Sequence, residues 1–133
     1  MSTARETTAE LLNNNPALLE LGLPEDAVIQ ADSAQSPTQR PFIVLRWGDQ
    51  QPGLGNYTRR PMTLWVYDEE GDPTRAERIG NKACEILKSH MQVKTDTGWI
   101  LEFREMLQGA DLFDEIFDAL VIPFNGLAVA SGV

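Results

Sequence analysis

The first third of the chain has a pattern of polar and apolar positions that predicts two short helices and a strand. Residues 3–13 are helix-forming until the sequence "NNNP" interrupts them. Asn15 suits the N-cap of a second helix and Pro16 its first position, so this helix is expected to end near Leu21. Residues 27–31 ("AVIQA") form a short strand candidate, and the polar stretch that follows ("DSAQSPTQR") is typical of a loop.

Two further strands are predicted around a long polar segment. Residues 41–47 ("PFIVLRW") are apolar on both alternating faces, which favours a central strand covered on both sides. Residues 48–61 contain three glycines and two prolines and are expected to be an exposed loop or the tip of an extended hairpin. Residues 62–68 ("MTLWVYD") are the next strand candidate, because their side chains alternate between two faces. Met62, Leu64 and Val66 suit the core, whereas Thr63, Trp65 and Tyr67 suit packing under a helix or a partner.

The clearest helix of the chain is predicted over residues 73–91. One face carries an apolar stripe with the 3.6-residue repeat of a helix, made of Ile79, Ala83, Ile86, Leu87 and His90. Cys84 borders this stripe. The long helix is therefore expected to pack on one face of a sheet.

The C-terminal third is predicted to contain two strands and one ambiguous segment. Residues 98–107 are a strand candidate whose apolar face consists of Trp99, Leu101, Phe103 and Leu107. In residues 111–120 ("DLFDEIFDAL"), a short helix capped by Asp111 competes with a structured loop. Residues 119–129 are the last strand, which Pro123 would confine to an edge or a bulge.

Together these elements predict one α+β domain over residues 1–133. Its sheet is expected to be mostly antiparallel, with four to five strands, one long helix packed on a face and short N-terminal helices.

Composition and charge exclude several classes of protein. The formal net charge of −9 disfavours a surface that wraps nucleic acid. One cysteine and one histidine cannot form a structural zinc site, and no apolar run approaches the roughly 18 residues of a membrane span. The polar start lacks an apolar signal segment, so synthesis in a cytoplasm is expected.

The acidic turn between residues 68 and 72 is the first candidate for chemistry. It contains Asp68, Glu69, Glu70 and Asp72 around Gly71. A calcium loop that starts at Asp68 would need glycine and glutamate where the chain has Pro73 and Ile79, so that match fails. A turn at Gly71 followed by a helix capped at Asp72 or Thr74 explains more of these residues.

Other catalytic patterns are weaker. His90 and Cys84 are six positions apart on the predicted helix, about 240° around its axis, so they do not form a dyad. The glycines at 53–55 fit no nucleotide-binding fingerprint, and we expect no cofactor and no metal. A catalytic carboxylate pair would have to come from the acids of residues 102–118, which are more typical of a solvated face.

Two groups of residues are instead candidates for protein interfaces. The first combines aromatic and basic side chains, as interface anchors often do, and consists of Tyr57, Arg59, Arg60 and Trp65. The second is acidic and consists of Asp111, Asp114, Glu115 and Asp118. Residues 40–60 sum to +3 and residues 102–133 to −5, so the basic segment of one copy could meet the acidic segment of another.

The order of these features resembles the small tail-terminator (tail-completion) proteins of long-tailed bacteriophages. The similarity runs from about Arg40 to Val129 and rests on "RPFIVLRWG", the long hairpin loop, "TLWVYDEEGDPTR" leading into a helix, "GWILEF" and "DLFDEIFDAL". The chain departs from the family in its last strand, where a more polar and basic sequence is expected.

This resemblance implies a structural virion protein rather than an enzyme. Six copies would form a ring that caps the tail tube, stops its polymerisation and joins the tail to the connector proteins of the head. DNA would pass through the ring without specific binding. Ring and tube contacts would fall on residues 49–60 and 111–118.

Three alternatives remain open from the sequence. One is a neighbouring neck or head-closure component of the same particle. The second is a small metal-dependent hydrolase that uses the carboxylates of residues 68–72 or 102–118. The third is an adaptor that binds a peptide along an open sheet edge.

Overall fold

The computed structural model describes residues 3–31, 39–53, 55, 57–69, 71, 73–90, 93–95 and 98–131. Its helices are α1 (Ala4–Leu12), α2 (Pro16–Glu20) and α3 (Pro73–Ser89). Its strands are β1 (Val28–Gln30), β2 (Phe42–Trp47), β3 (Gln51–Pro52), β4 (Tyr57–Asp68), β5 (Val93–Thr95), β6 (Gly98–Gln108), β7 (Leu112–Asp114) and β8 (Ala119–Ser131). Most of the predicted loop at 32–40 lies outside the described residues.

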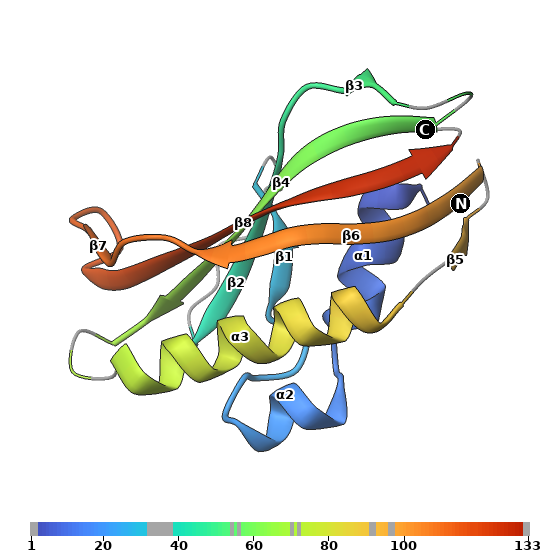
Figure 1. Ribbon diagram of the computed structural model, residues 1–133. Helices are drawn as coiled ribbons and strands as arrows, with labels where there is room; N and C mark the ends of the chain where they lie inside the picture. The colour runs from blue at the N-terminus through green and yellow to red at the C-terminus, as the bar shows by residue number, and fades with distance from the viewer. Residues whose placement is uncertain are drawn as a thin grey trace.

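The strands form one mixed sheet in the order β1-β2-β4-β8-β6-β5, to which β3 is added beside β4 and β7 beside β8. β1 and β2 are parallel and all other pairs are antiparallel. The long strands curve together into a curled half-barrel (Figure 1). The predicted α+β class is confirmed, but the predicted sheet of four to five strands was too small, because three short strands lie in segments that resemble loops or a helix.

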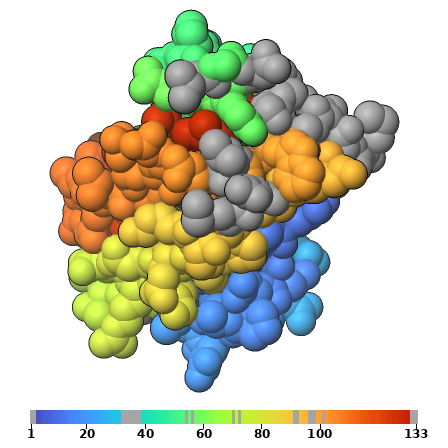
Figure 2. Space-filling model, turned by 45° about the vertical axis from the view of Figure 1, so that its right-hand side comes forward, coloured from blue at the N-terminus to red at the C-terminus, as the bar shows by residue number. Residues whose placement is uncertain are grey.

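Helix α3 covers one face of the sheet, opposite β4, β6 and β8. Its buried side includes Ala76, Ile79, Ala83 and Leu87, which confirms the predicted stripe at three positions. Ile86 is only partly buried, and so is His90, which follows the end of the helix at Ser89. Met62, Leu64 and Val66 of β4 are also buried, as the alternation predicted. α1 and α2 lie beside α3 and extend the helical layer, the blue and yellow regions of the lower surface in Figure 2.

Three consecutive asparagines fix the N-terminal helices to the sheet. The Asn13 amide donates to the carbonyl of Val28 (3.0 Å) and accepts from its N–H (2.9 Å). The Asn14 amide donates to the side-chain carboxylate of Asp26 (3.0 Å) and accepts from its N–H (2.9 Å). Asn15 caps α2 by accepting from the N–H of Ala17, with Pro16 in the first turn, as predicted.

One prediction for the C-terminal third was wrong, and one alternative that the sequence left open is decided. β8 is a central strand between β4 and β6, although it contains Pro123. The carbonyl of Pro123 accepts from the N–H of Gly109, just past the end of β6. Pro123 has no N–H to donate, and it lies where β6 has ended and β7 has not begun, so the missing donor breaks no strand pairing on that side. Residues 111–118 form β7 and a turn rather than a capped helix, which leaves the structured-loop alternative.

β6 departs from strict alternation. Its register with β8 shifts between Ile100 and Glu102 and again between Arg104 and Leu107. Among the β6 side chains whose burial is described, Ile100, Phe103 and Met106, three positions apart, are buried. Trp99 and Leu107, which were expected on one apolar face with Phe103, are 45% and 69% exposed. Glu105 has a φ of 57°, a left-handed conformation within the second bulge.

None of the helices in the described parts of the chain is long and apolar enough to span a membrane.

Candidate functional site

The acidic turn after β4 is a structural junction at its first residue. Asp68 is completely buried, and both of its carboxylate oxygens accept from the guanidinium of Arg75 in the first turns of α3, at 2.9 Å from Nε and 2.5 Å from an Nη. It also accepts from the N–H of Glu69 (2.7 Å). This ion pair ties the strand to the helix, so Asp68 is not available as a metal ligand. Glu70 and Asp72 lie outside the described residues.

The alternation of β4 separates the predicted interface residues between the two faces of the sheet. Arg60 shares a face with Met62 and Leu64, and this face carries the helices. Tyr57, Arg59 and Trp65 are on the opposite face, which has no helix on it. We call this second face the open face.

A β-hairpin with an acidic and apolar tip lies at one end of the open face. We define it as residues 111–118, and it contains all four predicted acidic candidates, Asp111, Asp114, Glu115 and Asp118. β7 pairs with the start of β8, and four residues form the turn. The Asp114 carboxylate accepts from the N–H groups of Ile116 (2.9 Å) and Phe117 (3.1 Å), so this acid holds the turn in shape.

Two further contacts fix the hairpin 111–118 to the sheet. The ring of Phe117 stands edge-on to the stacked rings of Phe42 and Tyr67, with centroids 5.9 and 5.5 Å away. The Arg40 guanidinium donates to the carbonyl groups of Phe117 and Asp118. Burial, together with the Asp114 carboxylate, which accepts a hydrogen bond from the phenol, raises the pKa of Tyr67. The tip is thus held rigidly by its base.

The same hairpin exposes large apolar side chains. Ile116 at its tip is 93% exposed, and Leu112 and Phe113 of β7 are nearly half exposed. A groove lies between the hairpin and β4 and is lined by Trp65, Tyr67, Leu112, Phe113, Asp114, Glu115, Ile116 and Val121. The indole N–H of Trp65 is buried there without a hydrogen-bond partner among the described residues. Rigid exposed apolar groups of this kind are typical of a partner-binding surface.

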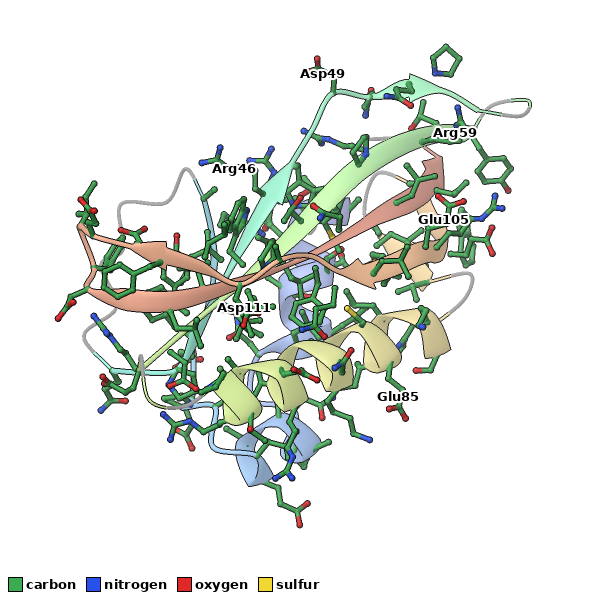
Figure 3. The ribbon with its side chains drawn as sticks, turned by 60° about the vertical axis from the view of Figure 1, so that its left-hand side comes forward. Arg46, Asp49, Arg59, Glu85, Glu105 and Asp111 are labelled. Carbon is green, nitrogen blue, oxygen red and sulfur yellow. The ribbon has the colours of Figure 1, made fainter. Side chains whose placement is uncertain are left out.

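A second groove lies at the other end of the open face. It is lined by Pro52, Gly53, Tyr57, Arg59, Glu102, Arg104 and Val129, and we call it the Arg59 groove. Arg104 forms an ion pair with Glu102 (3.5 Å). Arg59 is exposed and has no ion-pair partner among the described residues. Figure 3 shows Arg59 near the β3 end of the sheet, well away from Asp111.

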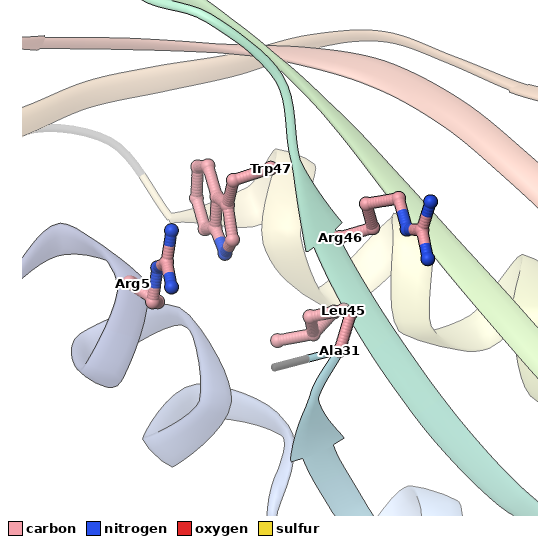
Figure 4. A pocket seen from close by; sticks show the side chains of 5 residues that line it. All are labelled: Arg5, Ala31, Leu45, Arg46 and Trp47. Atoms are coloured by element: carbon pink, nitrogen blue, oxygen red, sulfur yellow. The ribbon is translucent and has the colours of Figure 1, made fainter. Parts of the chain in front are cut away.

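Two neighbouring hollows on the helical face share Arg5 and Trp47, and Arg60 lines only one of them, the groove of the helical face, together with Glu6. In the other hollow, Arg5 of α1 faces the indole of Trp47, with Ala31 and Leu45 beside them, while Arg46 extends from the other side of β2 (Figure 4). The Arg60 guanidinium lies 5.4 Å from the centre of the Trp47 ring and donates to the carbonyl of Gly48 (2.8 Å). Burial, then the like charge of Arg5, lowers the pKa of Arg60, and Asp49 opposes this. These contacts give Arg60 a structural role.

Cys84 and His90, which the sequence already argued against as a catalytic dyad, are separate from these grooves. Cys84 is buried, and burial raises the pKa of its thiol to about 11. His90 follows the last turn of α3, where Nδ1 lies 2.7 Å from the carbonyl of Ile86, as expected for a structural imidazole at a helix end.

The structure therefore brings Trp65 together with Asp114 and Glu115, and Tyr57 together with Arg59, at opposite ends of one face. The sequence reasoning missed the apolar side chains of the hairpin, Leu112, Phe113, Ile116 and Phe117. Their signal was the repeated apolar pairs in "DLFDEIFDAL", which left a short helix and a structured loop as alternatives.

Comparison with known proteins adds a fold relative. No protein-family model and no curated protein sequence matches the chain. A chain in a solved structure described as "Virion of native gene transfer agent (GTA) particle" is similar, with a TM-score of 0.69 and 15% identity. The alignment covers 94% of this chain and 92% of that one. At this identity the likeness shows that the two chains share a fold across nearly their whole lengths.

Proposed function

We propose that this protein is a structural component of a phage-like particle and acts as its tail terminator. In this role six copies form a ring on the end of the tail tube, stop tube growth and join the tail to the connector proteins of the head. The observation that carries the proposal is the shared fold with a chain of the gene transfer agent virion. The resemblance of the sequence to tail-terminator proteins supports the same role independently of the fold.

The separation of charge along the open face is consistent with a ring. The hairpin 111–118 carries four acids and no base, whereas the Arg59 groove carries two arginines and one acid. Different surfaces that complement each other give heterologous contacts, and these close into a ring when the rotation between copies allows it. With the net charge of −9, DNA would pass through such a ring without being held tightly.

An enzymatic role has less support. The hydrolase alternative needs carboxylates that are free to bind a cation, but Asp68 is engaged by Arg75 and Asp114 by the backbone of its own turn. The buried Cys84 has a raised thiol pKa, which does not suit a nucleophile.

The direct test is to mix the purified protein with tail-tube protein of the same particle. We expect electron micrographs to show tubes that end in a ring and stop growing, and native mass measurements to show complexes with six copies. A stable monomer or a two-fold dimer in the presence of tube protein would contradict the proposal.

A neck or head-closure role differs only in the partner. A pull-down with immobilised tube protein and, separately, with connector protein distinguishes the two roles. Retention by the connector protein alone would favour the neck role over the tail terminator.

A further inference from the structure

The hairpin 111–118 is built to enter a site on another molecule. Its turn is held by Asp114, its base by Arg40 and its underside by the ring of Phe117. A rigid tip loses little conformational entropy on binding, because its side chains and backbone are already ordered. At the same time, the apolar side chain of Ile116 is exposed to solvent, and no contact among the described residues accounts for an apolar side chain at this position.

The Arg59 groove has the complementary character. Tyr57, Pro52 and Val129 give it an apolar lining, and Arg59 adds a cation without an ion-pair partner among the described residues. The groove is at the opposite end of the same strands: Tyr57 pairs with Ser131 there, whereas Asp68 pairs with Leu120 beside the hairpin. Eleven residue steps at about 3.3 Å put the two ends roughly 35 Å apart, so the hairpin cannot reach the groove of its own chain.

We propose that the hairpin 111–118 of one copy binds in the Arg59 groove of a second copy. Ile116 packs against Tyr57 and Pro52, and the Glu115 carboxylate faces Arg59. A pair of copies joined by this contact keeps one free groove and one free hairpin, so further copies add in the same direction. This inference rests on the proposed ring in one respect only, which is that the occupant of the groove is a second copy of this chain.

The groove of the helical face is a poorer site for the hairpin. Its cations, Arg5 and Arg60, are accompanied by Glu6 in the lining and by Asp49 near Arg60. Arg60 is also engaged by Gly48 and Trp47. Both grooves are lined by two arginines and one acid, but only Arg59 combines exposure with the lack of an ion-pair partner among the described residues, so the open face offers the more available cation.

A cross-linking experiment tests the contact. One preparation carries Ile116→Cys and a second carries Pro52→Cys, both at exposed positions, and the buried Cys84 does not compete. Under mild oxidation we expect a disulfide-linked dimer in the mixture, formed at least about tenfold faster than when Pro52→Cys is replaced by Glu77→Cys, an exposed control on α3. Equal rates for the two mixtures would overturn the proposal.

Charge reversal supplies a second readout that does not depend on the cysteine positions. Glu115→Arg and Arg59→Glu should each slow cross-linking about tenfold, and the mixture of the two variants should recover the original rate. Glu77→Arg is the matched control and should have no effect. Recovery that fails while both single variants remain folded by circular dichroism would also overturn the contact.

The outcomes separate this inference from the proposed function. Rings on tail tubes that persist in the Glu115→Arg variant would leave the function intact and refute the contact. Efficient cross-linking in a protein that does not cap tubes would support the contact and refute the function. If Arg59→Glu abolished retention of duplex DNA and left cross-linking unchanged, the groove would be a nucleic-acid site instead.

Discussion

At the scale of single residues, the pair of Asp68 and Arg75 has the largest structural role outside the apolar core. A carboxylate with no exposed surface is stable there only because the guanidinium and an N–H satisfy it. The sequence placed Asp68 in an acidic turn but gave no signal for its partner, because Arg75 is one of several basic residues on the same helix.

Removing the cation should therefore cost more than removing an exposed one. We expect Arg75→Ala to lower the free energy of unfolding by about 3 kcal/mol, since Asp68 is left buried and unpaired. Arg78→Ala, at an exposed position of the same helix, should change it by less than about 0.5 kcal/mol. Urea unfolding of both variants measures the difference, and equal effects would argue against the role of the ion pair.

Gly80 is a second position where adding a single carbon atom is expected to change stability. A Cβ there would lie 1.9 Å from a ring carbon of Phe124. Gly→Ala inside a helix ordinarily stabilises by about 1 kcal/mol, but here overpacking should reverse the sign and destabilise by about 1–3 kcal/mol.

Thermal unfolding of Gly80→Ala measures this effect, and Gly71→Ala, where nothing lies within 4 Å, is the control. Adding Phe124→Leu to Gly80→Ala should recover part of the loss, because the smaller side chain makes room for the methyl group. A Gly80→Ala variant more stable than the parent would contradict the packing described.

Cys84 predicts a dependence of stability on pH. Burial raises the pKa of its thiol from 9.0 to about 11, so between these values the unfolded chain releases the proton and the folded chain keeps it. Stability should be unaffected by this group below pH 9 and fall by up to about 2–3 kcal/mol by pH 11.

The measurement is denaturant unfolding across this range for the parent chain and for Cys84→Ala. Tyr67, whose pKa is also raised, contributes a similar decline in both proteins, so the difference between them isolates the thiol. Identical pH profiles would show that the thiol ionises equally in both states.

At the scale of elements, the hairpin 111–118 depends on one side chain. Asp114→Ala removes the acceptor for two backbone N–H groups, so we expect the amide protons of Ile116 and Phe117 to exchange faster. Global stability should fall by only about 1–2 kcal/mol, because the core lies elsewhere.

Hydrogen exchange of the hairpin amides measures this local effect. Glu115→Ala is the neighbouring control and should leave exchange unchanged, because the acceptor of both turn N–H groups is the Asp114 carboxylate. Unchanged exchange in Asp114→Ala would mean that Arg40 and Phe117 alone hold the tip.

Elements with local signals could be predicted, and those decided by distant contacts could not. The cap at Asn15, the alternation of β4 and the stripe of α3 follow from a few neighbouring residues. The bulges of β6 and the pairing of β7 with β8 arise from register across strands, which the spacing of apolar residues in one segment does not encode. The position of the Pro123 strand in the sheet was predicted wrongly for the same reason. Whether a central strand tolerates a proline depends on where the neighbouring strand ends.

The candidate site was likewise predictable only in part. Residue type alone made Tyr57, Arg59 and the four acids interface candidates, but it could not place Arg60 on the other face until the strand was known to begin at Tyr57. The apolar half of the hairpin was not proposed, because the sequence left a helix and a loop as alternatives for this segment.

At the scale of the whole molecule, the two ends of the open face differ in charge, and association between copies should depend on salt. If the hairpin of one copy meets the Arg59 groove of another, raising NaCl from about 0.05 to about 1 M should weaken self-association, since the screening length falls from above 10 to about 3 Å. Sedimentation velocity at several salt concentrations measures this, and association that strengthens with salt would indicate a mainly apolar contact.

The hydrogen bonds between the Asn13 side chain and Val28 of β1 affect how copies can combine. The Asn13 amide occupies both hydrogen-bonding groups of Val28 on this edge strand, in the way a neighbouring strand would. β5, at the other end of the strand order, is only three residues long. Short or occupied borders resist the addition of foreign strands, so backbone pairing between molecules is disfavoured at these two borders. A peptide ligand would accordingly find little backbone at β1 to pair with.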